Sequence, residues 1–221
     1  MREEMKRSFL SDYPFRVIHN GIDLDVFRPI VRGTKCFTRG TDCFTRGTQC
    51  STDFVTYLGV ASIWLDEKGL PDLIRMSGML NSDERMVLVG KLPKGMKQGL
   101  PKNVTHVPRT ENVTELARMY SEASVFLNPT WQDNYPTVNL EAQACGTPVV
   151  TYRTGGSPES LTPATGAVVE QGDVDGMLAQ ARRFAAMDRD VVRGACREHA
   201  LRNFAKTDRY NDYIELYQSM L

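Results

Sequence analysis

Short apolar runs alternate with amphipathic stretches from residue 54 onward, and this alternation predicts an α/β fold. The runs lack regular polar positions, which is typical of parallel strands buried on both faces. We expect such strands at 54–60, 86–90, 104–107, 124–129, 147–150 and 167–170. Helical spacing predicts helices at 70–80, 111–121 and 136–145, then three helices after residue 173, separated near Asp188 and Lys206. The expected fold class is a Rossmann-like, doubly wound parallel sheet.

The first 53 residues have a different pattern. Residues 15–18 predict a short strand, Asn20-Gly21 a turn, and Pro29 the end of a second weakly apolar stretch. Residues 32–52 are three copies of a seven-residue unit, RGTKCFT, RGTDCFT and RGTQCST. Gly and Thr in each copy oppose a helix, and the cysteine spacing lacks the close pairs of a zinc site. We expect a surface loop there, with a thiol or metal role as the alternative.

Composition and charge narrow the class of protein. Lys plus Arg and Asp plus Glu both number 27, so no net charge favours nucleic acid or an anionic membrane. No apolar run reaches the ~18 residues of a membrane span, and the charged N-terminus is not a secretory signal, so we expect a cytoplasmic protein. The five cysteines form no even framework, and Cys145 and Cys196 fall in predicted helices as free thiols.

Candidate chemistry is concentrated in the stretch DNYPTVNLEAQACGTPVV, residues 133–150. Two carboxylates, Asp133 and Glu141, bracket a turn and the start of the helix that we expect to end at Gly146. The free N–H groups at a helix N-terminus suit a phosphate, and carboxylates accept hydrogen bonds from sugar hydroxyls. The stretch therefore suggests a nucleotide-sugar site. The alternative is a helix that only connects two strands, with its charges solvated.

Three further stretches fit the same site. Lys68-Gly69 follows the first strand of the domain and precedes a helix, the arrangement with which α/β folds bind phosphate. Arg109 follows the third strand, where it would border a nucleotide base. Gly155 and Gly156 permit close backbone approach and precede Ser157, a plausible helix N-cap. Trp131, just before this stretch, could pack against the site or cap the sheet edge, and we expect packing.

The stretch 133–150 resembles the signature of retaining glycosyltransferases of the GT-B fold, the family 4 type. That signature has two Glu separated by seven residues, followed by A-x-A-x-G-x-P-V-V; here Asp133 stands at the first Glu and Glu141 at the second. The segment VIHNGIDLDVFRP is similar to the family's crossing from the N-terminal acceptor domain to the C-terminal donor domain. The K-G pair at Lys68 and the G-G-x-x-E at Gly155 also match. Where many relatives have Arg after the strand's Gly, this chain has Val60.

The resemblance implies the C-terminal half of a GT-B fold. It divides the chain into a crossing segment (1–30), a repeat-containing loop (31–53) and a nucleotide-sugar-binding domain with C-terminal helices (54–221). It implies a retaining transferase that moves a sugar from a nucleoside diphosphate sugar to a glycan or lipid-linked saccharide, without a cofactor or metal. The partner would be an N-terminal acceptor domain, absent from this chain, through which peripheral membrane contact would occur. This chain alone would be inactive.

The resemblance also assigns roles to single residues. It places Lys68 on the diphosphate, Asp133 near the sugar hydroxyls and Glu141 on the ribose, with Asp133 and Glu141 as the catalytic pair. The helix N–H groups around Thr137 and Val138 would bind phosphate. The turn residues Asn134 and Tyr135 join Arg109 as further substrate-binding candidates.

Two other classes of function stay open. One is a non-catalytic nucleotide-sugar-binding or assembly module, because a fold does not fix a function. The other is a GT-B epimerase or phosphorylase, although a phosphorylase would need a cofactor lysine in a context that the sequence does not show.

Overall fold

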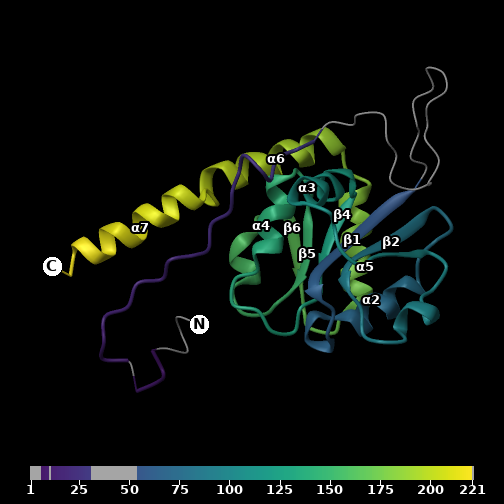
Figure 1. Cartoon of the computed structure of the whole chain (residues 1–221), viewed down its shortest axis with the longest axis horizontal. Coiled ribbons are helices and arrows are strands. Elements are labelled where there is room, and N and C mark those ends of the chain that lie inside the picture. Colours follow the sequence, from purple (N-terminus) through teal and green to yellow (C-terminus); the bar gives the residue numbers. More distant parts are fainter. Residues whose placement is uncertain (1–5, 10, 31–53, 221) are drawn as a thin grey trace.

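The computed structural model describes residues 6–9, 11–30 and 54–220, and a six-stranded parallel sheet forms its centre (Figure 1). The strands run in the order β3-β2-β1-β4-β5-β6. Their bounds are Val55–Ile63 (β1), Glu84–Lys91 (β2), Val104–Val107 (β3), Val125–Asn128 (β4), Val149–Tyr152 (β5) and Gly166–Val169 (β6). All five neighbouring pairs are parallel. The predicted fold class is confirmed.

Helices cover both faces of the sheet, and each face has its own apolar core. One core joins α2 (Leu70–Ser77) and α5 (Val174–Ala185) to the sheet. The other joins α3 (Val113–Glu122) and α4 (Thr137–Ala144), and α6 (Arg189–Asn203) packs on α4. The last helix, α7 (Lys206–Gln218), extends beyond the sheet and has no buried residue (Figure 1). The three C-terminal helices and their two breaks are confirmed.

The strand order reverses between β1 and β4. β1 continues through β2 to β3 on one side, and β4 continues through β5 to β6 on the other. In open parallel sheets, ligands bind outside the carboxyl ends of the strands at such a reversal. The loops that leave β1 and β4 carry Lys68 and Asp133 respectively.

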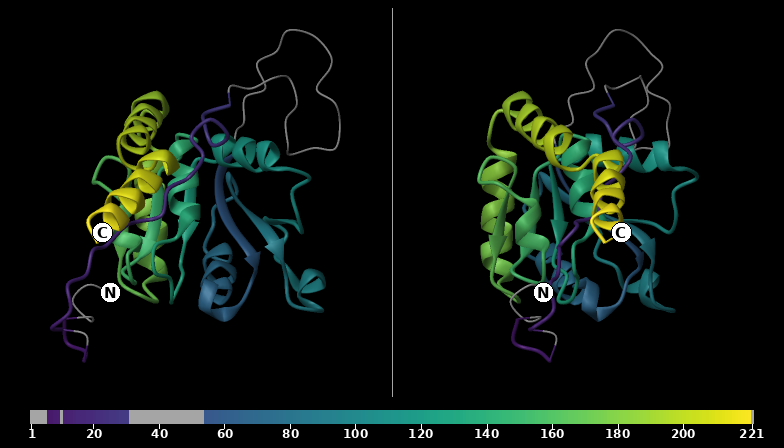
Figure 2. Two further views of the ribbon diagram at one scale, coloured as in Figure 1. Left: turned by 60° about the vertical axis from the view of Figure 1, so that its left-hand side comes forward. Right: turned by 90° about the vertical axis from the view of Figure 1, so that its left-hand side faces the viewer.

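The predicted strand at residues 15–18 is wrong. This segment pairs with none of the described strands. It runs beside α7, away from the sheet (Figures 1 and 2), where Arg16 forms ion pairs with Asp212 and Glu215. Its first backbone pairing comes later, as an isolated parallel bridge between Ile22 and Ala205. The predicted loop at residues 32–52 lies outside the described residues.

Three predicted helix limits also need correction. Ser157 is no N-cap: it begins a 3-10 turn, Ser157–Ser160, and Gly156 occupies the capping position. The helix predicted from residue 111 begins at Val113, because the Asn112 side chain accepts a hydrogen bond from the N–H of Glu115. The helix predicted to reach residue 80 ends at Ser77.

Two expectations about the rest of the chain can be compared with the structure. Cys145 and Cys196 are free and fully buried, as predicted, and burial raises the pKa of each thiol to about 12. Among the described residues no helix is both long and apolar enough to span a membrane.

Candidate functional site

Lys68 and Asp133 meet at the strand-order reversal. The ammonium Nζ of Lys68 lies 2.9 Å from Oδ2 of Asp133, and both side chains are partly exposed. Lys68 ends a 3-10 turn after β1, and the following Gly69 has φ +73°, where a Cβ would lie 2.1 Å from the Pro129 carbonyl oxygen. Glycine therefore lets the loop after β1 press against the end of β4. The backbone N–H of Trp131 donates to the Glu67 carbonyl, which ties the two loops together.

The turn at residues 133–135 rests on the two glycines predicted for close approach. The N–H of Gly156 donates to the Asn134 carbonyl at 2.7 Å. A Cβ on Gly155, whose φ is +46°, would lie 1.8 Å from the Asp133 carbonyl oxygen. The Thr154 hydroxyl donates to the Trp131 carbonyl at 3.0 Å. Residues 154–156 thus support the backbone of Asp133 and Asn134 through close contacts and hydrogen bonds.

The N-terminus of α4 follows this turn. Pro136 occupies the N-cap and provides no side-chain acceptor, so the first N–H groups of the helix, on Thr137 and Val138, have no cap. Thr137 is exposed and Val138 is half-buried. Such an N-terminus carries a partial positive charge, and it lies at the carboxyl edge of the sheet beside Asp133.

Buried polar side chains hold α4 in place. Asn139 accepts a hydrogen bond from Asn128 of β4 at 2.8 Å and donates to Ser160 at 3.4 Å. One turn later, Gln143 donates to the backbone carbonyls of Asn139 and Ser160. These bonds connect α4 to β4 and to the 3-10 turn after the glycines, so they fix where the helix points.

Glu141 faces α3 rather than the Lys68–Asp133 pair. Its Oε2 accepts a hydrogen bond from the hydroxyl of the fully buried Tyr120 at 3.0 Å. Burial raises the pKa of the Glu141 carboxyl, and hydrogen bonds from Tyr120 and Thr137 oppose that rise. Burial also raises the pKa of the Tyr120 hydroxyl well above its ordinary value. Tyr120 therefore stays a hydrogen-bond donor to Glu141 at neutral pH.

Tyr135 contacts the segment that precedes the domain. His19 stacks on its ring with centroids 4.3 Å apart, and Asn20 donates to its backbone carbonyl at 3.2 Å. His19 also lies 2.8 Å from Glu159. His19 is not among the predicted site residues, and its local sequence gives no signal for these contacts.

The two remaining predicted residues lie at the edge of this arrangement. Arg109 is exposed beyond the end of β3, which β2 separates from β1. Its predicted role at the base stays a prediction. Trp131 is partly exposed, donates to Asp72 at 2.9 Å and meets the ring of Tyr152 edge-on. Trp131 belongs to the same loop as Asp133 and connects that loop to α2 and β5.

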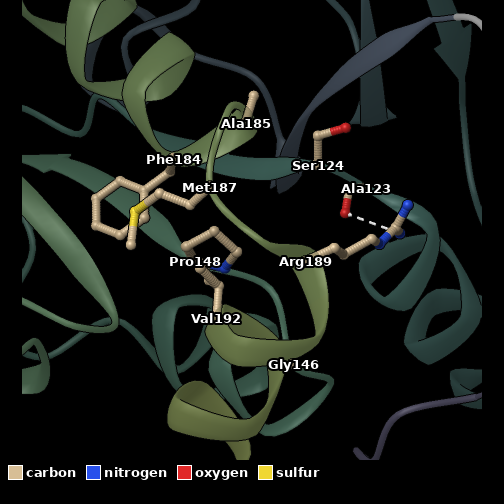
Figure 3. Close-up of a pocket in the computed structure, with 9 residues that line it drawn as sticks. All are labelled: Ala123, Ser124, Gly146, Pro148, Phe184, Ala185, Met187, Arg189 and Val192. Atoms are coloured by element: carbon tan, nitrogen blue, oxygen red, sulfur yellow. Dashed lines mark hydrogen bonds between the residues drawn. The ribbon is translucent and has the colours of Figure 1, made fainter.

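A hollow of about 110 Å³ lies elsewhere, near the amino ends of β4 and β5 (Figure 3). Its apolar side is formed by residues such as Phe184, Met187 and Pro148, and Arg189 borders it. None of the predicted site residues lines it. The hollow is at the opposite edge of the sheet from Lys68 and Asp133. In the part of the chain that the structure describes, no three His, Cys, Asp or Glu residues group as metal ligands.

A lysine, a carboxylate and a helix N-terminus lie together at the carboxyl edge of a parallel sheet, an arrangement typical of α/β proteins that bind phosphorylated ligands. Residues 54–186 match the family model described as Glycosyl transferases group 1. The chain therefore belongs to this glycosyltransferase family.

Relatives in sequence are transferases of sugars. The chain is 30% identical to a GDP-mannose-dependent monoacylated alpha-(1-6)-phosphatidylinositol monomannoside mannosyltransferase from Corynebacterium glutamicum, over 77% of this chain and 46% of that protein. It is also 30% identical to a D-inositol 3-phosphate glycosyltransferase from Mycolicibacterium paratuberculosis, over 78% of this chain and 41% of that protein. The chain thus spans less than half the length of these curated relatives.

Solved structures of GT-B glycosyltransferases share the fold. Sucrose-phosphate synthase from Thermosynechococcus elongatus superposes with a TM-score of 0.79 at 22% identity, over 99% of this chain and 56% of that one. The Anabaena protein HepE in complex with UDP-glucose superposes with a TM-score of 0.66 at 16% identity, over 92% of this chain and 57% of that one. Identities this low establish the fold alone.

Proposed function

We propose that this chain is the donor-binding part of a retaining glycosyltransferase of the family 4 type. In this proposal a sugar passes from a nucleoside diphosphate sugar to a glycan or a lipid-linked saccharide. The observation that carries it is the pairing of Lys68 with Asp133 beside the uncapped N-terminus of α4, at the strand-order reversal.

Each part of that arrangement suits one part of the donor. The Lys68 ammonium and the N–H groups of Thr137 and Val138 are donors for the diphosphate. Asp133, with Asn134 and Tyr135 in the same turn, would contact the sugar hydroxyls. Glu141 would accept hydrogen bonds from the ribose.

The Lys68–Asp133 ion pair has a consequence for binding. In the described structure the lysine already has an anionic partner, 2.9 Å away. A diphosphate must share or displace that partner, because two anions then compete for one ammonium. The sugar hydroxyls, which donate hydrogen bonds, would in turn compensate Asp133 when the donor binds. The arrangement therefore favours the complete sugar nucleotide over a nucleoside diphosphate that lacks the sugar.

Transfer requires an acceptor site that we assign to another domain. The relatives are more than twice as long as their matched regions, which leaves room for an N-terminal acceptor-binding domain. We propose that this domain is the partner of the present chain, that the reaction is cytoplasmic, and that any peripheral contact with a membrane occurs through that domain.

Calorimetric titration of the 221-residue chain tests the proposal. UDP-glucose, GDP-mannose, UDP, GDP and the free nucleosides serve as ligands. Lys68→Ala should weaken binding of the diphosphates by about 10- to 100-fold, as expected for a lost charge-assisted hydrogen bond, and should hardly change nucleoside binding. Lys102→Ala, an exposed lysine before β3 at the opposite edge of the sheet, is the matched control.

Equal losses for nucleoside and diphosphate would show that Lys68 supports the fold rather than the phosphates. The absence of any nucleotide or sugar-nucleotide binding by the wild-type chain would refute the proposed donor site.

A further inference from the structure

A histidine outside the predicted site joins two of the loops that form it. The His19 imidazole stacks on the ring of Tyr135, with centroids 4.3 Å and planes 25° apart. Its Nε2 lies 2.8 Å from Oε2 of Glu159, which belongs to the 3-10 turn that follows Gly155 and Gly156. One side chain therefore contacts both the turn that carries Asp133 and the turn that supports it.

The backbone around His19 is held firmly enough for this contact to matter. Ile22 donates to the Phe204 carbonyl at 2.8 Å, and Lys206 donates to the Ile22 carbonyl at 3.0 Å. A Cβ on Gly21 would lie 2.7 Å from Cα of Lys206, so the chain crosses the start of α7 at close range. Asn20 adds its hydrogen bond to the Tyr135 carbonyl. The backbone that carries His19 is thus held in place by hydrogen bonds, and its imidazole contacts Tyr135 from there.

The ring stack with Tyr135 contributes more to holding His19 than the contact with Glu159 does. The side chains of His19 and Glu159 are 35% and 55% exposed, and ion pairs at such exposure contribute little to stability. Tyr135 is half-buried and packs against the apolar cluster that includes Leu140 of α4 and Phe204. The Tyr135 ring packs on the apolar cluster, and the backbone next to His19 is hydrogen-bonded to Phe204 and Lys206. The stack between the two rings therefore restricts the turn at residues 133–135.

We propose that His19 is a positioning residue for the sugar end of the donor. By stacking on Tyr135 and pairing with Glu159, it holds residues 133–135 in the conformation that places Asp133. The inference rests on the proposed function and adds to it that the segment before the domain sets the affinity for the sugar. His19 itself touches neither the diphosphate nor the reacting atoms in this proposal.

Titration of matched variants tests the positioning role. With UDP-glucose and GDP-mannose, His19→Ala should weaken binding by about 3- to 10-fold, the effect expected from losing an aromatic stack. With UDP and GDP the change should stay within about twofold, because these ligands lack the sugar that the turn at residues 133–135 would contact. His19→Phe keeps the stack and should retain most of the sugar-nucleotide affinity. Arg16→Ala, which removes the two ion pairs of the same segment with Asp212 and Glu215, should change neither affinity.

Amide hydrogen exchange without ligand gives a second, independent reading. The Gly156 N–H donates to the Asn134 carbonyl, so its exchange rate reports whether the turn at residues 133–135 stays hydrogen-bonded to residues 154–156. His19→Ala should accelerate that exchange, and Arg16→Ala should not. His19 is partly exposed, so its truncation leaves no buried cavity and the variant should fold.

Each result has a defined meaning. Unchanged exchange at Gly156, or equal losses for sugar nucleotides and nucleoside diphosphates, overturns the positioning role. If the wild-type chain binds its ligands and His19→Ala binds them equally well, this inference alone fails. If the wild-type chain binds none of the four ligands, the proposed function and this inference fall together.

Discussion

Glu141 lies on the side of α4 that packs against α3, where a carboxylate is costly to hold. Tyr120 and Thr137 donate hydrogen bonds that lower the pKa of Glu141, but burial is the larger effect. The pKa of the Glu141 carboxyl is therefore raised. A group whose folded pKa lies above its unfolded pKa stabilises the fold fully only below the unfolded pKa. Its contribution is lost as pH rises through the folded pKa. Ionising Glu141 in the folded protein therefore costs stability, and a raised carboxyl pKa of this kind is found often at functional sites.

Glu141→Gln should consequently separate stability from binding. The amide keeps the shape without the buried charge, so the melting temperature at pH 7 should equal or exceed that of the wild type, with the gain disappearing toward pH 4. Sugar-nucleotide affinity should fall by about 10- to 100-fold, because a charge-assisted hydrogen bond to ribose is worth ~1.5–3 kcal/mol. Scanning calorimetry at the two pH values and titration measure both effects. A variant that melts lower and binds normally would make Glu141 a structural residue.

Residues with a local sequence pattern were the ones that could be selected as candidates. Asp133 and Glu141 share one stretch, and Lys68 follows the end of a strand, so motif spacing and strand geometry suffice to select them, and the structure brings Lys68 and Asp133 together. Tyr120 and His19 were missed, because each meets the site from another element, 21 residues before Glu141 and 116 before Tyr135. Neither has a local pattern that distinguishes a contact to the site from an ordinary aromatic or exposed residue.

At the scale of elements, all six strands of the domain could be predicted, because buried parallel strands appear as short apolar runs. The segment at residues 15–18 failed for the complementary reason: an apolar run shows β-propensity but not whether another strand lies beside it. The buried Asn139 and Gln143 could not be predicted, since their partners Asn128 and Ser160 come from other elements. The direction of α4 is thus fixed by tertiary contacts, which local sequence does not show.

An ion pair at the far edge of the sheet ties two layers together. Arg182 of α5 donates through Nε and a terminal nitrogen to the two carboxylate oxygens of Glu84, at 2.8 and 2.7 Å. Tyr57 of β1 donates to the same carboxylate at 2.8 Å. The Arg182 hydrogen bond, the largest cause, lowers the pKa of Glu84 to about 2 against the opposing effect of burial. Glu84 is only 5% exposed, so its charge depends on these partners.

Arg182→Met should destabilise the domain by about 3 kcal/mol at pH 7, the lower end for a buried pair because Arg182 is partly exposed. The folded pKa of Glu84 lies below its unfolded value of about 4.5, so the contribution is present above pH 4.5 and is lost as pH falls through about 2. Urea unfolding measured from pH 7 to pH 3 should therefore show that the difference in unfolding free energy between wild type and variant decreases as the pH falls. Arg183→Met, at the exposed neighbour over the ring of Phe184, is the control and should cost far less. If the difference in unfolding free energy did not depend on pH, lost packing rather than the charge of Glu84 would cause the destabilisation.

At the scale of the whole molecule, the C-terminal helix leaves an apolar surface open. α7 projects beyond the sheet beside the N-terminal segment (Figures 1 and 2). Its large side chains are 43–60% exposed: Tyr210, Tyr213, Ile214 and Tyr217. Tyr13 and Val17 of the neighbouring segment are exposed as well. In the proposed enzyme, these residues would be available to the acceptor-binding domain, which would cover them.

The last prediction concerns transfer itself. An acceptor hydroxyl must be held in line with the anomeric carbon of the donor, and such positioning can lower a barrier by roughly 7 to 11 kcal/mol. Our proposal assigns the donor to the groups at the carboxyl edge of this sheet and the acceptor to a second domain. We expect this chain alone to bind a sugar nucleotide and to transfer nothing measurable. Adding an N-terminal GT-B domain, covalently or in trans, should restore transfer.

Two measurements decide this prediction. Release of nucleoside diphosphate from UDP-glucose or GDP-mannose is followed by chromatography with an acceptor panel that includes D-inositol 3-phosphate, and the anomeric configuration of the product is read by nuclear magnetic resonance. Retention in the two-domain protein, with no product from the chain alone, is the expected result. Inversion would remove the retaining mechanism while leaving the donor site intact. Turnover by the chain alone at an ordinary enzymatic rate would show that its own residues hold the acceptor, so the division of labour between two domains would be wrong.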